Sequence, residues 1–455
     1  MAGELERDIK KRGKQLLVTI GSKKPPMFQG LSGRILERCM RNVSFKTKIL
    51  RFIEKLPLLP TPETTIQYLN HHFREQKIQN LPWPVRLFLW AIRYNNKLIT
   101  IMADKFIRAE TEKVASVFLI NNDSKTAAKT IEKLRKRGFA CTIDIIGESL
   151  TDESKARDYR RLYYLLLAQL ETDEPWKTLG DSGSNMDWGY APKINIALKP
   201  SSLCSTPDPN NFEKSVESLC RSIEPILLKA VEIGAFVWID MEQYRFKDIT
   251  IEAYRRLRSN LTFHHWPHFG IAIQSYLRDT DRDLANLLEW AREKNLPIAI
   301  RLVKGAYWDH EVEVARQGNI EPPVYTRKAE TDAAFERHTK KILENHDICF
   351  YAGASHNIRS IAFGLATKKE LHVPEDRAEN QVLYGIGELV GTAILKTGGH
   401  VRFYCPLGKP LDGTAYLVRR ILENTANESI IRQIFVEKAD ADRLLENPLE
   451  ILKDN

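Results

Sequence analysis

The sequence predicts an α/β protein in which a (β/α)8 barrel follows an N-terminal helical domain. Two observations lead to this fold class. Residues 1–115 carry apolar side chains at helical spacing and show no useful alternation of strand type. Residues 116–455 alternate short apolar runs with helical stretches, which is the order of a protein built from β/α units. A doubly wound parallel sheet is the competing arrangement.

The segment 1–115 is predicted to form a helical arm domain. The run 32–56 places apolar residues on one helix face. Prolines then punctuate the segment and are expected to start or end helices, because proline lacks the backbone N–H of a helix interior. These prolines are Pro57, Pro60, Pro62, Pro82 and Pro84.

Eight short runs in 116–455 are predicted to be the barrel strands. Most are almost continuously apolar, as expected for parallel strands that are buried on both faces. Helical stretches such as 281–295 separate them, and eight such units favour a closed barrel. The runs are Phe139–Glu148, Lys193–Lys199, Phe236–Glu242, Phe269–Tyr276, Pro297–Gly305, Ile348–Ser355, Asn380–Gly387 and Val401–Gly408.

Composition excludes several classes of protein. With 43% hydrophobic and 28% charged residues, the chain is neither disordered nor of low complexity. Its longest apolar stretch, about 87–92, is too short to cross a bilayer, and the charged N-terminus lacks a secretory signal. The 6 cysteines form no CxxC pattern, which predicts reduced thiols, no metal site and a cytoplasmic location. We interpret the net charge of +9 as solvated helix faces, because the basic clusters lack interleaved aromatic residues.

Polar or charged residues occupy nearly every predicted strand end, where (β/α)8 barrels hold their functional side chains. The densest group is Arg301, Lys304 and Gly305, and the glycine lets a ligand approach the backbone. Cations in so apolar a strand need a partner, and ion pairs with Asp309 or Glu311 are the purely structural alternative. The strand-end candidates are Glu148, Lys199, Asp240, Gln274, Arg301, Lys304, His356 and Tyr404.

A predicted helix at 413–424 carries a second candidate site. Tyr416, Arg419, Arg420 and Glu423 follow a spacing of i, i+3, i+4 and i+7 and therefore share one helix face. Paired guanidinium groups suit a small carboxylate, which each can bind through two hydrogen bonds. A solvated face with an ion pair between Arg419 and Glu423 is the structural alternative.

Motifs of other chemistries are absent. The glycines at 385–391 lack the dinucleotide-binding spacing, and no phosphate-binding loop, zinc-protease or serine-hydrolase motif occurs. Lys199 or Lys304 would serve as the Schiff-base lysine of a barrel lyase, which is the alternative enzyme. A barrel that binds a ligand without catalysis is the third hypothesis. We also expect Asp240 and Glu242 to point to opposite faces and not to act as a carboxylate pair.

Four segments, Arg301–Asp309, Val324–Lys328, Ser355–Asn357 and Tyr416–Asn427, together resemble the flavin-dependent proline dehydrogenases. The resemblance extends from about Leu31 to the C-terminus and is strongest to the proline dehydrogenase part of bifunctional bacterial proline-catabolic enzymes. It implies a distorted TIM-like barrel that holds FAD without a Rossmann motif. It also implies oxidation of L-proline to Δ1-pyrroline-5-carboxylate, the first step of proline catabolism to glutamate. A hydride would pass to flavin N5 and electrons to a membrane quinone, with peripheral association at the inner face of the membrane.

The resemblance also implies roles for single residues. Arg301 would approach flavin N5, Asp240 matches an active-site acid, and Glu148 matches a gate acid that pairs with Arg419. Residues that would grip the proline carboxylate are Lys199, Arg419 and Arg420. Residues that would surround the pyrrolidine ring are Tyr307, Leu383, Tyr404 and Tyr416. Residues that would hold FAD are Gln274, Arg301, Val303, Lys304, Gly305, Trp308, Arg327, Lys328, Ser355, His356 and Glu423.

Three motifs depart from the family pattern, which puts local loop shapes in doubt more than the chemistry. KPSSL at 199–203 replaces K-x-S-A-L, AENQVL at 378–383 lacks the usual aromatics, and SHN replaces THN. Tyr404 is kept where hydroxyproline dehydrogenases typically carry a smaller residue, so we expect a preference for L-proline over 4-hydroxyproline. We expect neither the DNA-binding segment nor the aldehyde dehydrogenase domain of the bifunctional relatives, and therefore no nucleic-acid partner. A separate pyrroline-5-carboxylate dehydrogenase is then a candidate partner.

Overall fold

A computed structural model describes residues 2–22, 43–74, 83–93, 96–122, 124–146, 152–171, 179, 186–188, 190–204, 207–409, 418 and 440–453. Within these residues, eight parallel strands close into a barrel, which confirms the predicted fold class. Each strand overlaps one of the eight predicted runs. The strands are β1 (Ala140–Ile145), β4 (Asn195–Leu198), β5 (Phe236–Ile239), β6 (Phe269–Gln274), β7 (Ile298–Val303), β8 (Cys349–Ala354), β9 (Ala378–Leu383) and β10 (Val401–Leu407).

The barrel closes because β1 pairs in parallel with β10 on one side and with β4 on the other. The register between β1 and β10 runs from Ala140↔Arg402 to Ile145↔Leu407. This closure excludes the open doubly wound sheet. All strands point the same way, so all their carboxyl ends meet at one end of the barrel.

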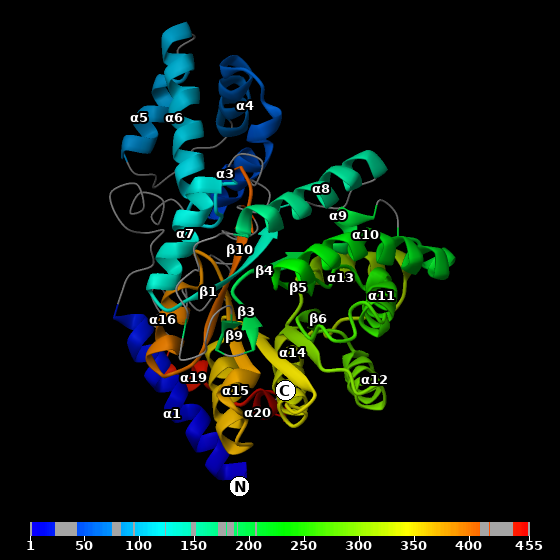
Figure 1. Cartoon of the computed structure of the whole chain (residues 1–455). Helices are drawn as coiled ribbons and strands as arrows, with labels where there is room; N and C mark the ends of the chain where they lie inside the picture. The colour runs from blue at the N-terminus through cyan, green and yellow to red at the C-terminus, as the bar shows by residue number, and fades with distance from the viewer. Residues whose placement is uncertain are drawn as a thin grey trace.

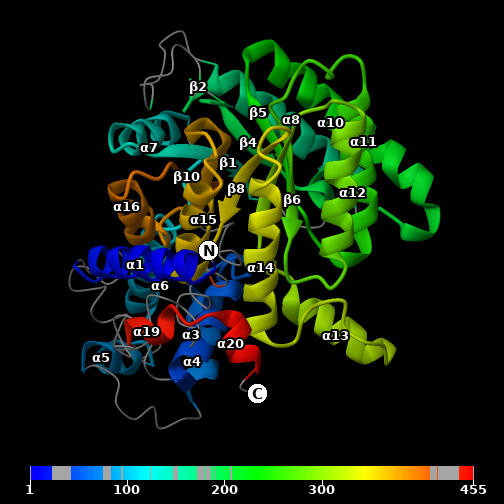
Figure 2. The same ribbon diagram turned by 90° about the horizontal axis from the view of Figure 1, so that it is seen from below.

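Helices surround the strands, as Figure 2 shows from below. Their apolar faces pack on the outside of the barrel in one continuous core. The helices along the barrel are α7 (Ser124–Lys136), α8 (Glu153–Leu170), α10 (Phe212–Ile233), α11 (Lys247–Ser259), α12 (Thr280–Glu293), α14 (Lys328–Leu343), α15 (Ile358–Glu370) and α16 (Glu388–Lys396). Shorter or projecting helices are α9 (Pro200–Leu203), α13 (Trp308–Gly318), α19 (Ala441–Leu444) and α20 (Pro448–Lys453).

Most described residues of the predicted helical arm are helical, and its helices α3 to α6 stand beyond one end of the barrel (Figure 1). Phe52, Leu69 and Phe73 belong to its own apolar core. A second cluster joins the base of the arm to the barrel, because Phe118 packs with Leu383 at the carboxyl end of β9. The arm helices are α3 (Val43–Lys55), α4 (Pro62–Arg74), α5 (Trp83–Ala91) and α6 (Lys97–Ala115).

The first helix, α1 (Ala2–Gly21), packs along α15 and α16 instead of joining the arm helices (Figures 1 and 2). Arg359 on α15 holds it, because the Nη2 atom donates to Glu6 Oε2 at 2.8 Å. Leu445 lies so close to Gly13 that a Cβ at this glycine would come within 2.3 Å of it. The division into an arm domain (1–115) and a barrel domain (116–455) stays a prediction.

A short hairpin of β2 (Met186–Asp187) and β3 (Ala191–Pro192) covers the amino end of the barrel. Asp187 there accepts from Arg135 at 2.7 Å, and Arg402 pairs with Glu379 at 2.9 Å. All four side chains are at most 1% exposed, so each charge has its partner inside the protein. Polar groups at this end of such barrels serve stability rather than catalysis.

Candidate functional site

A cavity of about 670 Å³ opens at the carboxyl ends of the strands, where the fold predicts the site. Every barrel strand, or the residue after it, contributes to its wall. Twelve of the predicted site residues line this cavity: Lys199, Asp240, Gln274, Arg301, Val303, Lys304, Gly305, Tyr307, Ser355, His356, Leu383 and Tyr404. The predicted residues Glu148, Tyr416, Arg419, Arg420 and Glu423 lie outside the described residues.

Lys199 presents a cation to this cavity. Its Nζ atom contacts the carboxylate of Asp144 and lies 3.4 Å from the Tyr404 hydroxyl and 3.9 Å from Asp240 Oδ2. Burial acts to lower the pKa of Lys199, but the carboxylates of Asp144 and Asp240 outweigh it and raise this pKa. The amine therefore stays charged at neutral pH. With 21% of its side chain exposed, it remains within reach of an anionic ligand.

Arg301 is a buried cation with unused hydrogen-bond donors. Only 3% of the residue is exposed. Its Nη1 atom contacts Asp240, and its Cζ atom lies 4.8 Å from the centroid of the Trp238 ring. Within the part of the chain that the structure describes, the Nε and Nη2 atoms have no hydrogen-bond partner. Buried donors without a partner are costly, so these two point to a ligand with acceptor atoms.

Asp240 fixes the orientation of two neighbours. One oxygen contacts Arg301, and the other accepts a hydrogen bond of 2.7 Å from the Tyr404 hydroxyl. Burial raises the pKa of Tyr404 well above its ordinary value, so this hydroxyl stays protonated and acts as a donor. The phenol ring is thereby held in one orientation in the cavity wall.

The expectation that Asp240 and Glu242 point to opposite faces is wrong. Residues two positions apart on one strand share a face, so the premise of this expectation is wrong. Asp240 and Glu242 both line the cavity, and so does Met241 between them. In addition, β5 ends at Ile239, so strand alternation does not govern these positions. The two carboxylates nevertheless have separate partners, since Glu242 accepts from the Ser201 backbone N–H at 2.7 Å and hydroxyl at 2.6 Å.

Gln274 lines the same cavity as Arg301. Its Nε2 atom donates to the Glu242 carbonyl oxygen at 3.1 Å, and its Oε1 atom is buried without a hydrogen-bond partner among the described residues. Lys304 contacts Asp332 on α14, and burial lowers its pKa. The cations Arg301 and Lys304 thus pair with Asp240 and Asp332, and the structural alternative of pairs with Asp309 or Glu311 is wrong.

Gly305 occupies a backbone conformation that suits only glycine. Its φ is +132°, and a Cβ there would lie 2.4 Å from the ring of Tyr276. The ring of Tyr276 takes the place of a side chain here, so packing requires the glycine, while Gly305 itself lines the cavity.

The residues His356 and Asn357 of the Ser355–Asn357 segment have different roles. His356 lines the cavity and accepts at Nε2 from the Leu383 backbone N–H at 3.0 Å. Asn357 instead caps α15, because its Oδ1 atom accepts from the Ser360 N–H at 3.0 Å. The histidine therefore ties the end of β8 to the end of β9 within the cavity wall.

Three predicted cofactor residues do not line the cavity. Trp308 is 41% exposed and donates from its Nε1 atom to the Tyr325 carbonyl oxygen at 2.9 Å. Arg327 and Lys328 are exposed at the start of α14. Lys328 contacts Asp332, the partner of Lys304, which connects this exposed group to the cavity wall.

Asp144 and Asp332 are not among the predicted site residues, although both pair with cations of the cavity wall. Asp144 is 2% exposed and is the counter-charge of Lys199. Its signal in the sequence is that it is the one charged residue in a mostly apolar strand, Ala140–Ile145. Asp332 offers no such signal, because acidic residues are common in surface helices.

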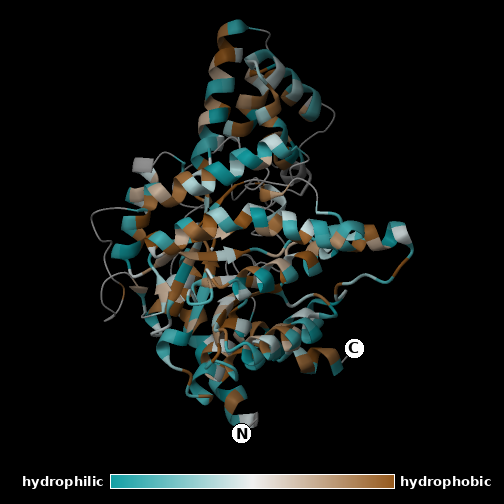
Figure 3. Cartoon of the chain, turned by 45° about the vertical axis from the view of Figure 1, so that its right-hand side comes forward, coloured by the Kyte–Doolittle hydropathy of each residue, from teal (hydrophilic) through white to brown (hydrophobic). Residues whose placement is uncertain are grey.

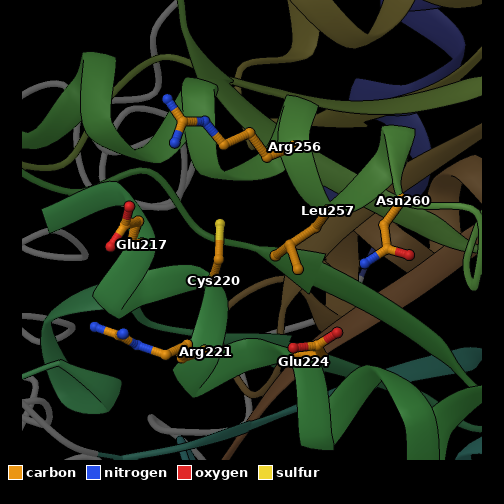
Figure 4. Close-up of a pocket in the computed structure, with 7 residues that line it drawn as sticks. All are labelled: Glu217, Cys220, Arg221, Glu224, Arg256, Leu257 and Asn260. Atoms are coloured by element: carbon orange, nitrogen blue, oxygen red, sulfur yellow. The ribbon is translucent and has the colours of Figure 1, made fainter. Parts of the chain in front are cut away.

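A second, smaller cavity of about 330 Å³ lies between α10 and α11, on the outside of the barrel (Figure 4). Burial raises the pKa of its only thiol, Cys220, to about 11, so the thiolate form is scarce at neutral pH. Arg256 at its edge is already paired with Glu213 at 2.5 Å. Among the described residues that line this cavity, none has a buried side-chain nitrogen or oxygen atom without a hydrogen-bond partner, in contrast to the barrel cavity.

Within the described residues, no cluster of three or more histidine, cysteine, aspartate or glutamate side chains is placed to hold a metal ion. No helix there has both the length and the apolarity to cross a membrane.

Two family models and several known proteins match this chain. The family model "Proline dehydrogenase" matches residues 127–433, and "Proline utilization A N-terminal domain" matches residues 6–118. Proline dehydrogenase 1 of Bacillus subtilis is 26% identical over 75% of this chain and 96% of its own length. The bifunctional protein PutA of Escherichia coli is 27% identical over 77% of this chain but only 25% of its own length.

Among solved structures, proline utilization A from Bdellovibrio bacteriovorus, inactivated by N-propargylglycine, has a TM-score of 0.86 and 33% identity. The match covers 98% of this chain and 44% of that one, so the chain spans less than half of this relative and about a quarter of the bifunctional curated relatives. Since the family model covers most of the barrel and the strand-end cavity, the chain belongs to the proline dehydrogenase family.

Proposed function

We propose that the chain oxidises L-proline to Δ1-pyrroline-5-carboxylate, with FAD as the cofactor and a membrane quinone as the final electron acceptor. The observation that carries this proposal is the group of Lys199, Asp240, Arg301 and Tyr404 in the cavity of a proline dehydrogenase barrel. It combines a cation open to the cavity, a buried guanidinium with unused donors and an aromatic wall.

The cavity residues fit FAD. Arg301 offers two buried donors, Gln274 offers a buried acceptor, and Gly305 lines the same cavity. These residues, with Val303 and Lys304, would hold the flavin part. When bound, FAD supplies N5, which accepts a hydride from the ring carbon next to the nitrogen. Arg301 would stabilise the negative charge that develops there, and its place is already fixed by Asp240.

The same cavity fits an amino acid with a small apolar ring. Lys199 would bind the carboxylate, joined by Arg419 and Arg420 as the family resemblance implies. Tyr404 and Leu383, both in the cavity wall, would pack against the ring. A substrate held by its carboxylate and its ring has its reacting carbon fixed, which lowers the entropic part of the barrier. Oxidation then removes a hydride from that carbon and a proton from the nitrogen, which forms the C=N bond.

The direct test measures proline-dependent reduction of a soluble dye by FAD-loaded protein and traps the imine product with an aromatic amino-aldehyde. We expect dye reduction and trapped product in equal amounts. We also expect N-propargylglycine, which inactivates the Bdellovibrio relative, to inactivate this protein and L-proline to protect it. Absence of dye reduction with fully FAD-loaded protein would refute the proposed substrate.

A barrel lyase remains the second candidate because of one observation. Burial lowers the pKa of Lys304, and a Schiff-base lysine must react as the neutral amine. Against this, Asp332 contacts the same amine, and Lys199 is held charged. Borohydride added with a carbonyl substrate would trap a lyase covalently at this lysine, whereas we expect no labelling.

A further inference from the structure

The segment 117–120, which follows the last arm helix, is bound to the end of the barrel that holds the cavity. The Ile120 backbone N–H donates to the Pro406 carbonyl oxygen at the end of β10, at 2.7 Å. The turn after β9 lies against the same segment, because a Cβ at Gly385 would come within 1.9 Å of the Val117 carbonyl oxygen. The arm is therefore fixed to the carboxyl ends of two barrel strands.

Four buried apolar residues form the contact on the arm side, and we name them the arm base. They are Leu50 on α3, Ala115 on α6, and Phe118 and Leu119 in the segment that follows. Each of them is at most 3% exposed. Figure 3 shows hydrophobic segments along the helices of the arm. A contact that is buried to this degree is packed like a protein core, so a change on one side of it displaces the other side.

On the barrel side, residues of the cavity wall belong to the same apolar cluster. Ile146 and Leu383 line the cavity and pack against the arm base. Val418 is a further member of the cluster and is 8% exposed. In the sequence, Arg419 and Arg420 follow Val418 directly, and consecutive Cα atoms lie only about 3.8 Å apart. The arm base thus shares one cluster with the ring wall of the cavity and with the residue before the arginine pair.

This shared cluster links the arm to ligand binding. A carboxylate gains most when several cations converge on it in one geometry, and a ring is fixed only by a wall that stays in place. We propose that the arm base, through Leu50 and Phe118, positions the substrate-binding residues. It acts on the ring wall through Leu383 and on the arginine pair through Val418. This inference rests on the proposed function and gives the N-terminal arm a part in it.

The test compares two leucines of equal burial. Leu50 lies in the arm base and Leu69 in the separate core of the arm, and both are 3% exposed. Leu50→Ala and Leu69→Ala remove the same atoms and should lower the melting temperature by similar amounts. Two constants are then measured with FAD-loaded protein. One is Kd for tetrahydrofuran-2-carboxylate, a ring carboxylate without a nitrogen, from the flavin spectrum, and the other is KM for L-proline.

Only Leu50→Ala should change these constants. We expect both to rise roughly tenfold, as they do when one molecule in ten holds the arrangement that binds the ligand. The value of kcat should stay within about twofold, because bound substrate restores that arrangement. Loss of stability alone predicts no such split between KM and kcat. Leu50→Met keeps the volume of the side chain and should leave both constants close to those of the unchanged protein.

A change from the barrel side tests the same contact. Val418→Ala should raise both constants, and in Leu50→Ala/Val418→Ala the two factors should not multiply, because both changes loosen one contact. Leu50→Val removes a smaller group and should raise the constants about threefold, with Leu69→Val as its control. This milder pair decides the question if Leu50→Ala does not fold.

Three outcomes would overturn the inference: unchanged constants in the Leu50 variants, equal rises in the Leu50 and Leu69 variants, or factors that multiply fully in the double variant. In each of them the unchanged protein still binds the ring carboxylate, so the proposed function stands. Failure of the unchanged FAD-loaded protein to bind either L-proline or tetrahydrofuran-2-carboxylate would instead overturn the proposed function, and this inference with it.

Discussion

Replacing Lys199 by methionine tests how the cavity binds its anionic ligand. The Lys199 amine lies between Asp144, Asp240 and Tyr404. Among the described cations of the cavity wall, it is the one that is partly exposed and has a raised pKa. A hydrogen bond to a charged group contributes about 1.5–3 kcal/mol, so we expect the affinity for the ligand carboxylate to fall roughly 10- to 150-fold. Methionine is unbranched and only one atom shorter than lysine, so it keeps most of the side-chain volume while it removes the charge and the hydrogen-bond donors.

The assay uses tetrahydrofuran-2-carboxylate, a ring carboxylate that lacks the nitrogen and cannot be oxidised in the same way. Its binding is followed by the change in the flavin spectrum, and KM for L-proline is measured beside it. The substitution also leaves Asp144, at 2% exposure, without its counter-charge, so the free energy of unfolding should fall by about 3 kcal/mol.

A double variant separates the two effects. In Asp144→Asn/Lys199→Met no uncompensated charge is left at this pair, so stability should recover while ligand affinity stays low. Asp144→Asn alone keeps the cation and should bind the carboxylate within a few-fold of the unchanged protein. The account of the site is refuted if Lys199→Met binds the ligand normally, or if Asp144→Asn weakens binding as strongly as Lys199→Met does.

Three further predictions concern other residues. Tyr404→Ser should raise kcat/KM for 4-hydroxyproline relative to L-proline by at least tenfold, because the tyrosine ring crowds the added hydroxyl; comparable values in the unchanged protein would contradict this. Gly305→Ala should lose bound flavin and lower the melting temperature, since its Cβ would lie 2.4 Å from Tyr276, whereas Gly318→Ala, with only a 3.7 Å contact, should not. Burial lowers the pKa of His338 to about 4, so the unfolded chain, with a pKa near 6.5, binds more protons between these values. The free energy of unfolding should therefore fall by roughly 2 kcal/mol from this group between pH 7 and 5, and urea titrations of His338→Gln should show a smaller fall.

The strands could be predicted because their signal is local. Near-continuous apolar runs mark most of the eight, as expected for strands that are buried on both faces, although β9 (AENQVL) carries three polar residues. The strand β9 starts two residues before its predicted run and ends at Leu383, because the following residues form a turn. The site at the carboxyl ends follows from the fold, which is why twelve predicted residues line one cavity.

Ion-pair partners could not be predicted in the same way. Arg301 pairs with Asp240, which is 61 positions away, and Lys304 pairs with Asp332 on a later helix. Acidic residues nearer in sequence, such as Glu311, have other partners, here the Tyr244 backbone N–H at 2.8 Å. A cation in an apolar strand can be predicted to need a partner. Which carboxylate reaches that cation depends on how the barrel closes, and the sequence does not show this.

The packing partner of α1 could not be predicted from the sequence either. Its amphipathic pattern predicts a helix with one apolar face, and that face has no sequence feature that selects between the arm and the barrel. In the structure it packs on α15 and α16, where Glu6 meets Arg359. The contact joins residues more than 350 positions apart.

The measurement that tests the central claim most directly is the visible spectrum of the purified protein before and after anaerobic addition of L-proline. We expect flavin absorption bands that bleach when L-proline is added, which reports the cofactor, the substrate and the hydride transfer together. A flavin that stays oxidised with L-proline would contradict the proposed substrate. A colourless protein that takes up no added FAD would contradict the account of the cavity itself.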